Sequence, residues 1–206
     1  MDKNELEKLR SQRERRLFHN FEIRTMQEGE EDQKIVEGYA ATFEQETVLF
    51  VIDGREYKEI IARGAFDESD FSDVIFNYNH GGKVMARTRN KTLETSIDNT
   101  GLFMRANLSG TEEGRKTYEE IKGGYIDRMS FAFRIAEESF NQETLTWTIR
   151  KISKVYDVSA VDYPAYDTTS IAARRLAEVE DLASRKAVVD AELQKRKQRL
   201  RILLEI

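Results

Sequence analysis

Residues 125–135 read Tyr-Ile-Asp-Arg-Met-Ser-Phe-Ala-Phe-Arg-Ile, and apolar side chains alternate with small or polar ones along them. This period of two predicts a half-buried strand. Its apolar face carries Met129, Phe131, Phe133 and Ile135. Ser130 lies on the opposite face, shortly after two glycines. Ser130 is therefore our candidate nucleophile, and an ordinary strand serine is the alternative interpretation.

A serine hydroxyl needs a base, and imidazole is the usual one because its pKa lies near neutral pH. The chain has two histidines, His19 and His80. No serine or carboxylate pattern surrounds His19, which we interpret as structural. His80 ends a predicted strand over residues 72–78, on the face of Val74, and two glycines follow it. This position suits either a catalytic base or a polar turn residue.

Several classes of protein are excluded by the sequence. There is no cysteine, so disulfides, thiol nucleophiles and cysteine zinc sites are absent, which fits a cytoplasmic protein. No apolar run has the length of a membrane helix, and the first residues lack the apolar core of a signal peptide. Gly-x-Ser-x-Gly, His-Glu-x-x-His, phosphate-binding and calcium-binding motifs are missing too. We expect no metal and no cofactor.

The order of predicted elements indicates an α+β, mainly β fold. Short alternating segments recur at regular spacing, and Asp53-Gly54 predicts a tight hairpin between two of them. Residues 111–122 predict a helix with Thr111 as its N-cap. The predicted strands are 20–26, 35–43, 48–52, 56–61, 72–78, 93–98, 102–108, 125–135, 145–152 and 155–161. Strands with few crossover helices favour a closed or nearly closed antiparallel β-barrel with peripheral helices.

Both ends of the chain are predicted to be helical extensions. Residues 1–19 and 174–206 are rich in Glu, Lys, Arg and Leu and carry a net positive charge, whereas the middle, residues 20–173, is acidic. The C-terminal tail is either a partner-binding or assembly helix or a solvated extension. An acidic body argues against a nucleic-acid-binding domain, although binding through the basic ends stays an alternative.

Six short motifs follow one another in a characteristic order. They are Val36-Glu37-Gly38-Tyr39-Ala40 with Phe43; Glu59-Ile60-Ile61-Ala62-Arg63-Gly64-Ala65-Phe66; Asn79-His80 with Arg87; Thr92-Leu93 to Asp98-Asn99-Thr100-Gly101-Leu102; Gly124-Tyr125-Ile126 running into Met129-Ser130-Phe131-Ala132-Phe133; and Asp157-Val158-Ser159-Ala160-Val161-Asp162-Tyr163-Pro164-Ala165. With them the chain resembles the phage prohead (procapsid maturation) serine protease family over about residues 22–173. That family is related in fold to herpesvirus assemblin.

The resemblance implies a herpesvirus-protease-type barrel with Ser130 as nucleophile and His80 as base. The third triad member of the herpesvirus relatives is a second histidine, but no histidine follows His80 here. Asp157 takes the comparable place, and a carboxylate can orient the imidazole. Asp162 and Glu94 are the alternatives, and strand parity favours Asp157 over Asp162. For the oxyanion, the resemblance points to the backbone N–H groups of Ala165 or Tyr166.

The resemblance also implies a biological role. It predicts a serine endopeptidase that cuts scaffold, or the scaffolding segment of the major capsid protein, and itself. The place would be the assembling prohead in the host cell cytoplasm. The herpesvirus relatives are dimers, so a homo-oligomer is part of this expectation, whereas membrane contact is not. A non-enzymatic capsid- or scaffold-associated protein is the competing interpretation.

Overall fold

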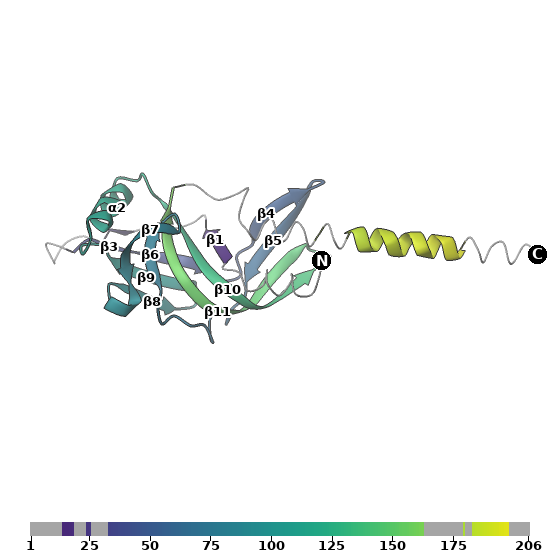
Figure 1. Cartoon of the computed structure of the whole chain (residues 1–206), viewed down its shortest axis with the longest axis horizontal. Helices are drawn as coiled ribbons and strands as arrows, with labels where there is room; N and C mark the ends of the chain where they lie inside the picture. The colour runs from purple at the N-terminus through teal and green to yellow at the C-terminus, as the bar shows by residue number, and fades with distance from the viewer. Residues whose placement is uncertain (1–13, 19–23, 26–32, 163–178, 180–182, 198–206) are drawn as a thin grey trace, which may run out of the picture. The chain divides into compact units, whose positions relative to one another are not determined.

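The structure of the chain is a computed structural model that describes residues 14–18, 24–25, 33–162, 179 and 183–197. The chain divides into two compact units, residues 1–167 and residues 168–206. The first unit consists mainly of strands, in two β-sheets (Figure 1). Within the described residues, no helix is long and apolar enough to span a membrane.

The larger sheet has seven strands and is built around one long strand, β11. Its strands are β1 (Glu14–Phe18), β10 (Arg128–Asn141), β11 (Thr146–Val161), β5 (Arg55–Ile61), β4 (Thr47–Ile52), β6 (Ile75–Tyr78) and β7 (Gly81–Arg87). The order is β1-β10-β11-β5-β4, and β6 lies on β11 with β7 beyond it. The paired β10 and β11 run the length of this sheet (Figure 1). The sequence predicted β11 as two strands, at 145–152 and 155–161.

β5 and β6 both pair with β11 in parallel, one after the other. β5 pairs with residues 146–149 of β11, and β6 pairs with residues 157–160. Between them, Asp70 forms a parallel bridge with Lys154. The chain from β5 to β6 thus follows one edge of β11, a pairing that hairpin signals do not predict.

The smaller sheet has four strands. In order they are β2 (Arg24–Thr25), β3 (Ile35–Thr42), β9 (Gly101–Asn107) and β8 (Leu93–Ile97), and a short 3-10 helix, η1 (Thr88–Asn90), leads into β8. All pairs in this sheet are antiparallel. The described strands therefore form two separate sheets, and the predicted closed antiparallel barrel is wrong in this respect.

The hydrophobic core joins side chains of both sheets. Val36 of β3 and Leu102 of β9 are fully buried in it, as are Phe131 and Phe133 of β10. The two phenylalanine rings stack with their centroids 4.4 Å apart. The apolar face predicted from alternation is thus the core face of β10, and burying such a side chain stabilises the fold by roughly 1.5–3 kcal/mol.

Helix α2 (Glu112–Lys122) connects β9 to β10 and matches its prediction. The Thr111 side chain accepts a hydrogen bond of 2.9 Å from the backbone N–H of Gly114, as an N-cap does. Tyr118 and Ile121 are buried on its inner face. Gly124 then adopts a left-handed φ of 75° and turns the chain toward β10.

The predicted N-terminal helical extension, residues 1–19, is wrong where the structure describes it. Residues 14–18 form strand β1 and pair antiparallel with residues 129–133 of β10. Helix propensity is a weak preference that tertiary contacts override, and the outer edge of β10 offers backbone N–H and C=O groups that need partners. Residues 1–13 and 19 lie outside the described residues.

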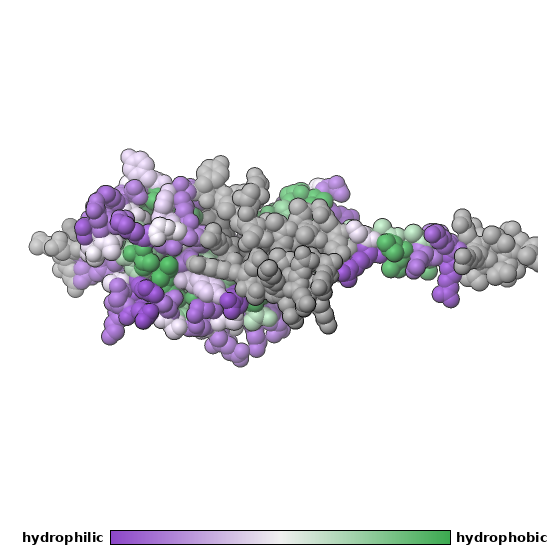
Figure 2. Space-filling model, in the orientation of Figure 1, coloured by the Kyte–Doolittle hydropathy of each residue, from purple (hydrophilic) through white to green (hydrophobic). Residues whose placement is uncertain are grey.

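In the second unit, residues 183–197 form a helix that lies within the predicted C-terminal tail. Its side chains are exposed, including the apolar Val188, Val189 and Leu193. Figure 2 shows apolar surface on this helix between hydrophilic side chains. In the first unit, a second apolar patch covers the β4–β5 hairpin, where Val48 and Val51 are exposed (Figure 2).

Candidate active site

The β10–β11 ladder brings three polar side chains to one face of the larger sheet. Ser130 of β10 pairs with Ser159 of β11, and Ala132 pairs with Asp157. Directly paired residues project to the same face, and so do residues two apart on a strand. Ser130, Asp157 and Ser159 therefore share the face opposite the Phe131 core side, as the alternation of β10 predicted for Ser130.

His80 reaches this face from the tip of the β6–β7 hairpin. Asn79 and His80 form a two-residue turn with φ values of 49° and 55°, the left-handed geometry of a type I′ hairpin. The Asn79 N–H donates a 2.9 Å hydrogen bond to the Ala160 carbonyl, which ties the tip to β11. The imidazole is thus placed by a turn and not by a strand.

Sequence parity predicted His80 on the face of Val74, and this is wrong. β6 pairs with residues 157–160 of β11 without a register shift from Ile75 to Tyr78. Asn77 pairs with Ser159 across the parallel β6–β11 ladder and so lies on the face that His80 reaches. The alternation of β6 ends at Tyr78, because Asn79 and His80 have positive φ and turn the chain, so strand parity does not extend to His80.

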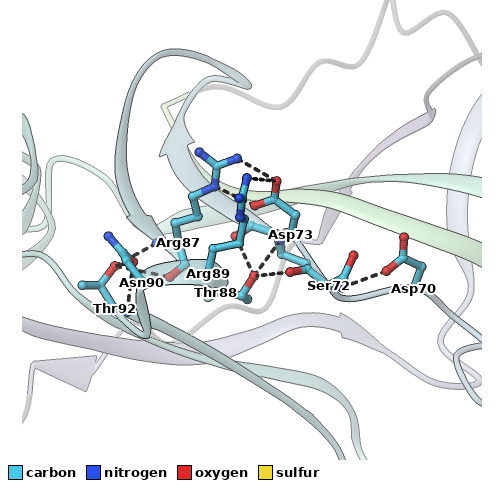
Figure 3. A network of polar contacts seen from close by, with 9 residues as sticks. Asp70, Ser72, Asp73, Arg87, Thr88, Arg89, Asn90 and Thr92 are labelled. Atoms are coloured by element: carbon cyan, nitrogen blue, oxygen red, sulfur yellow. Dashed lines mark hydrogen bonds and ion pairs between the residues drawn. The ribbon is translucent and has the colours of Figure 1, made fainter.

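The open end of the same hairpin is held by a polar network (Figure 3). Arg87 donates two hydrogen bonds of 2.6 Å to the carboxylate of Asp73, and Arg89 lies 3.7 Å from it. The Thr88 hydroxyl accepts from the Val74 N–H at 2.9 Å. The guanidinium of Arg87 holds the pKa of Asp73 below its usual range. The hairpin that carries His80 is thereby fixed at both ends.

The two imidazole nitrogens of His80 face two different partners. Nε2 lies 2.6 Å from Ser130 Oγ, and Nδ1 lies 2.7 Å from Asp157 Oδ1. Asp157 is fully buried, Ser130 is 4% exposed, and the His80 side chain is 9% exposed. With the ring proton on Nδ1, His80 donates to Asp157 and accepts the Ser130 proton at Nε2. This arrangement suits a serine nucleophile, a base and an orienting carboxylate.

Two further buried residues surround Asp157. Ser159 Oγ lies 2.8 Å from Asp157 Oδ1 and 3.1 Å from His80 Nδ1, and it also hydrogen-bonds Asn77 Oδ1. Ser159 is fully buried and Asn77 is 3% exposed. Sequence reasoning did not single out these two. The shared face of residues 157 and 159 was a signal for Ser159, whereas nothing in the sequence indicated the parallel strand that brings Asn77.

The other predicted site residues lie elsewhere or are not described. Asp162 follows β11 and accepts a 2.8 Å hydrogen bond from the Tyr78 hydroxyl, a contact that raises the pKa of Tyr78. Glu94 is exposed on β8 in the smaller sheet, where it pairs with Arg105. Ala165 and Tyr166 lie outside the described residues. No cluster of three potential metal ligands occurs among the residues that the structure describes.

Comparison with known proteins identifies the family. The caudovirus prohead serine proteases match this chain over residues 19–182. The chain belongs to the caudovirus prohead serine protease family. This finding confirms the resemblance stated from the sequence motifs, and it makes the chain a member of a serine protease family. The matched residues include all three members of the Ser130–His80–Asp157 arrangement.

The chain is also similar to one solved structure. This is the capsid assembly protease gp21 of bacteriophage T4, at 12% sequence identity and a TM-score of 0.43. The similarity covers 73% of this chain and 97% of that chain. Among curated proteins, none matches this chain.

Proposed function

We propose that this chain is the serine endopeptidase of phage capsid maturation. In this proposal it cuts scaffold, or the scaffolding segment of the major capsid protein, and itself inside the assembling prohead in the host cell cytoplasm. The observation that carries the proposal is the position of His80 between Ser130 Oγ and Asp157 Oδ1, at 2.6 Å and 2.7 Å. Membership of the prohead serine protease family supports the choice of substrate class.

The proposed mechanism uses these three residues in turn. Ser130 Oγ attacks the carbonyl carbon of the scissile peptide bond while His80 Nε2 takes its proton, and Asp157 stabilises the imidazolium that forms. His80 then protonates the departing amine, which leaves an acyl group on Ser130. Water, deprotonated by His80, attacks this ester and releases the second product. The backbone N–H groups of Ala165 or Tyr166 are our candidates for stabilising the oxyanion.

The substrate reaches this site beside the β6–β7 turn, in our proposal. A groove of about 840 Å³ lies between that hairpin and α2, and Asn79 and Gly81 on either side of His80 line it. Tyr125 and Ile126, which precede β10, line it as well. Tyr125 is 83% exposed, so its ring is accessible to a peptide in the groove. The groove therefore offers apolar contact to a peptide beside the turn that carries His80.

Self-cleavage gives the most direct test, because the protein is then its own substrate. We expect wild-type protein to lose terminal segments on incubation, measured by intact mass, and Ser130→Ala to stay whole. Ser96→Ala, which changes an exposed strand serine in the smaller sheet, should behave like wild type. Trimming of Ser130→Ala at the wild-type rate would mean that a contaminant does the cutting.

A second measurement applies if the protein cuts other proteins but not itself. A fluorophosphonate, which reacts with activated serines, should add its mass to wild type at Ser130 and should not label Ser130→Ala. The same two proteins are then incubated with capsid precursor and scaffold. Failure of wild type to label and to cut either protein would favour a non-enzymatic capsid- or scaffold-associated role.

A further inference from the structure

Ser159 occupies a position in which it can act on the candidate triad without touching a substrate. It lies on β11 two residues after Asp157, and it is fully buried. Its Oγ reaches the same carboxylate oxygen, Asp157 Oδ1, that faces His80 Nδ1, at 2.8 Å. It also lies 3.1 Å from His80 Nδ1 itself. A buried hydroxyl in contact with both members of a hydrogen-bonded pair affects how that pair is held.

The hydroxyl has a single proton, so its direction matters. If His80 Nδ1 donates to Asp157, then Ser159 can add a second donated hydrogen bond to the same carboxylate. Asn77 decides whether it does so, because Asn77 faces Ser159 from β6. An amide presents either an acceptor oxygen or an NH₂ donor after a half rotation. The structure places the amide oxygen toward Ser159 Oγ, an orientation that would take the hydroxyl proton. With the amide rotated so that its NH₂ faces Ser159, the amide donates to Oγ and leaves the hydroxyl proton for Asp157.

We propose that Ser159 is a positioning residue of this active site and that Asn77 acts through it. The Ser159 hydroxyl donates to Asp157 and holds the carboxylate against Nδ1 of His80. This keeps the ring proton on Nδ1 and leaves Nε2 bare, as a base for Ser130 must be. The inference rests on the proposed catalytic role of Ser130, His80 and Asp157, but its first test does not require any activity.

The geometry also separates Ser159 from the nucleophile. Ser130 faces Nε2, the nitrogen that is free to take a proton, whereas Ser159 faces Nδ1, which already contacts Asp157. Ser159 is also enclosed on all sides, and a substrate carbonyl has no access to it. Activation of Ser159 by His80 would require Nδ1 to give up Asp157.

The first test measures the tautomer of His80 directly. The chain has two histidines, so ¹⁵N spectra of the imidazoles are simple, and His19→Gln assigns them. We expect wild type to carry the ring proton on Nδ1, and Ser159→Ala to shift population toward the Nε2-protonated form. Ser159→Thr keeps the hydroxyl and should give the wild-type spectrum. Its melting temperature shows whether this variant folds.

A matched control separates this effect from simple loss of stability. Thr146 is buried near the far end of β11, where its hydroxyl donates to the Thr144 carbonyl at 3.0 Å. Thr146→Val removes a buried hydroxyl from the same strand and should lower stability without moving the His80 signals. If the His80 tautomer population is unchanged in Ser159→Ala, as it should be in Thr146→Val, then Ser159 only fills its buried position and the inference is overturned.

The second test uses the kinetics of peptide cleavage. Loss of a hydrogen bond to a carboxylate predicts a fall in kcat of about 10–100-fold for Ser159→Ala with KM unchanged. Asn77→Ala should cause a smaller fall, and the double variant should be no worse than Ser159→Ala alone, because Asn77 acts through Ser159. Additive losses in the double variant would contradict this coupling. Fluorophosphonate labelling at Ser159 instead of Ser130 would overturn the assignment of roles.

Discussion

At the scale of single residues, the proposed mechanism depends on which ring nitrogen of His80 carries the proton. Nδ1 faces Asp157 Oδ1 at 2.7 Å, and Nε2 faces Ser130 Oγ at 2.6 Å. A carboxylate only accepts hydrogen bonds, so it selects the ring with its proton on Nδ1. An amide in its place can donate, and it then favours the opposite tautomer, in which Nε2 cannot take a proton.

This reasoning gives a specific expectation for Asp157→Asn. We expect kcat to fall by about 10³–10⁴-fold, with the fold and the melting temperature close to wild type. The measurement is the rate of hydrolysis of a synthetic peptide whose sequence is taken from a self-cleavage site of the protein. Asp162→Asn is the matched control: Asp162 accepts from the Tyr78 hydroxyl at the exposed end of β11, and an amide oxygen can accept the same hydrogen bond, so kcat should stay near the wild-type value. An equal loss in both variants would speak against Asp157 as the orienting carboxylate.

The sequence predicted only those features of these residues that depend on neighbouring positions in the chain. Alternation along residues 125–135 gave the polar face of Ser130, and the glycines after His80 indicated a strand end. The contact between Ser130 and His80 depends on β6 joining β11 in parallel, which no local pattern specifies. Asn77 illustrates the limit best, since its place in the site follows from that pairing alone.

At the scale of single elements, β9 approaches β3 so closely that only glycine fits at one position. A Cβ on Gly101 would lie 1.9 Å from the carbonyl oxygen of Ala41 and 2.8 Å from its carbonyl carbon. Neither backbone atom can move away without breaking the ladder that pairs Gly101 with Thr42. Glycine at the start of β9 is therefore needed for the two strands to pair in this register.

We expect Gly101→Ala to lower the free energy of unfolding by about 3 kcal/mol, the upper end for overpacking. Urea unfolding monitored by the fluorescence of Trp147, the chain's one tryptophan, measures this loss. The control is Gly110→Ala, because a Cβ at Gly110 meets no atom within 4 Å. A Gly101→Ala protein as stable as Gly110→Ala would mean that β9 and β3 are not paired as described.

Elements were predicted well where local signals are strong. The Asp53-Gly54 turn lies between β4 and β5, and both of its residues have positive φ. Thr111 caps α2. The error at residues 14–18 has a clear physical cause: their composition favours a helix, but the outer edge of β10 at residues 129–133 requires a partner strand.

At the scale of the whole molecule, exposed ion pairs make the free energy of unfolding depend on pH in the acid range. Lys154 lies 2.7 Å from Asp70 and lowers the pKa of that carboxyl, and Arg87 does the same for Asp73. Hydrogen bonds from Lys83 to Glu113 and from Lys34 to Glu119 lower those pKa values as well. These carboxylates lie in the segment between β5 and β6 and on helix α2, and their effects on the stability of the first unit sum.

The sign of the dependence follows from these directions. Each group is more acidic in the folded chain than in the unfolded chain, where the usual values are 3.8 for Asp and 4.5 for Glu. Its contribution to stability is therefore fully present above the unfolded pKa and is lost as the pH falls through the folded pKa. We expect the free energy of unfolding in urea to decrease from about pH 5 to about pH 3. Added salt should shrink the decrease, because exposed pairs are screened.

Asp73→Asn should make this decrease smaller, because it removes the carboxylate that Arg87 and Arg89 hold at the base of the β6–β7 hairpin (Figure 3). Asp53→Asn is the control of equal charge change, in a turn where asparagine also tolerates the positive φ. If the free energy of unfolding depends on pH in the same way in both variants, then net charge, and not the pairing of Asp73, causes the loss of stability in acid. If only Asp73→Asn is flatter, the network that fixes the His80 hairpin is also part of what acid weakens, and activity should then decline in acid with the fold.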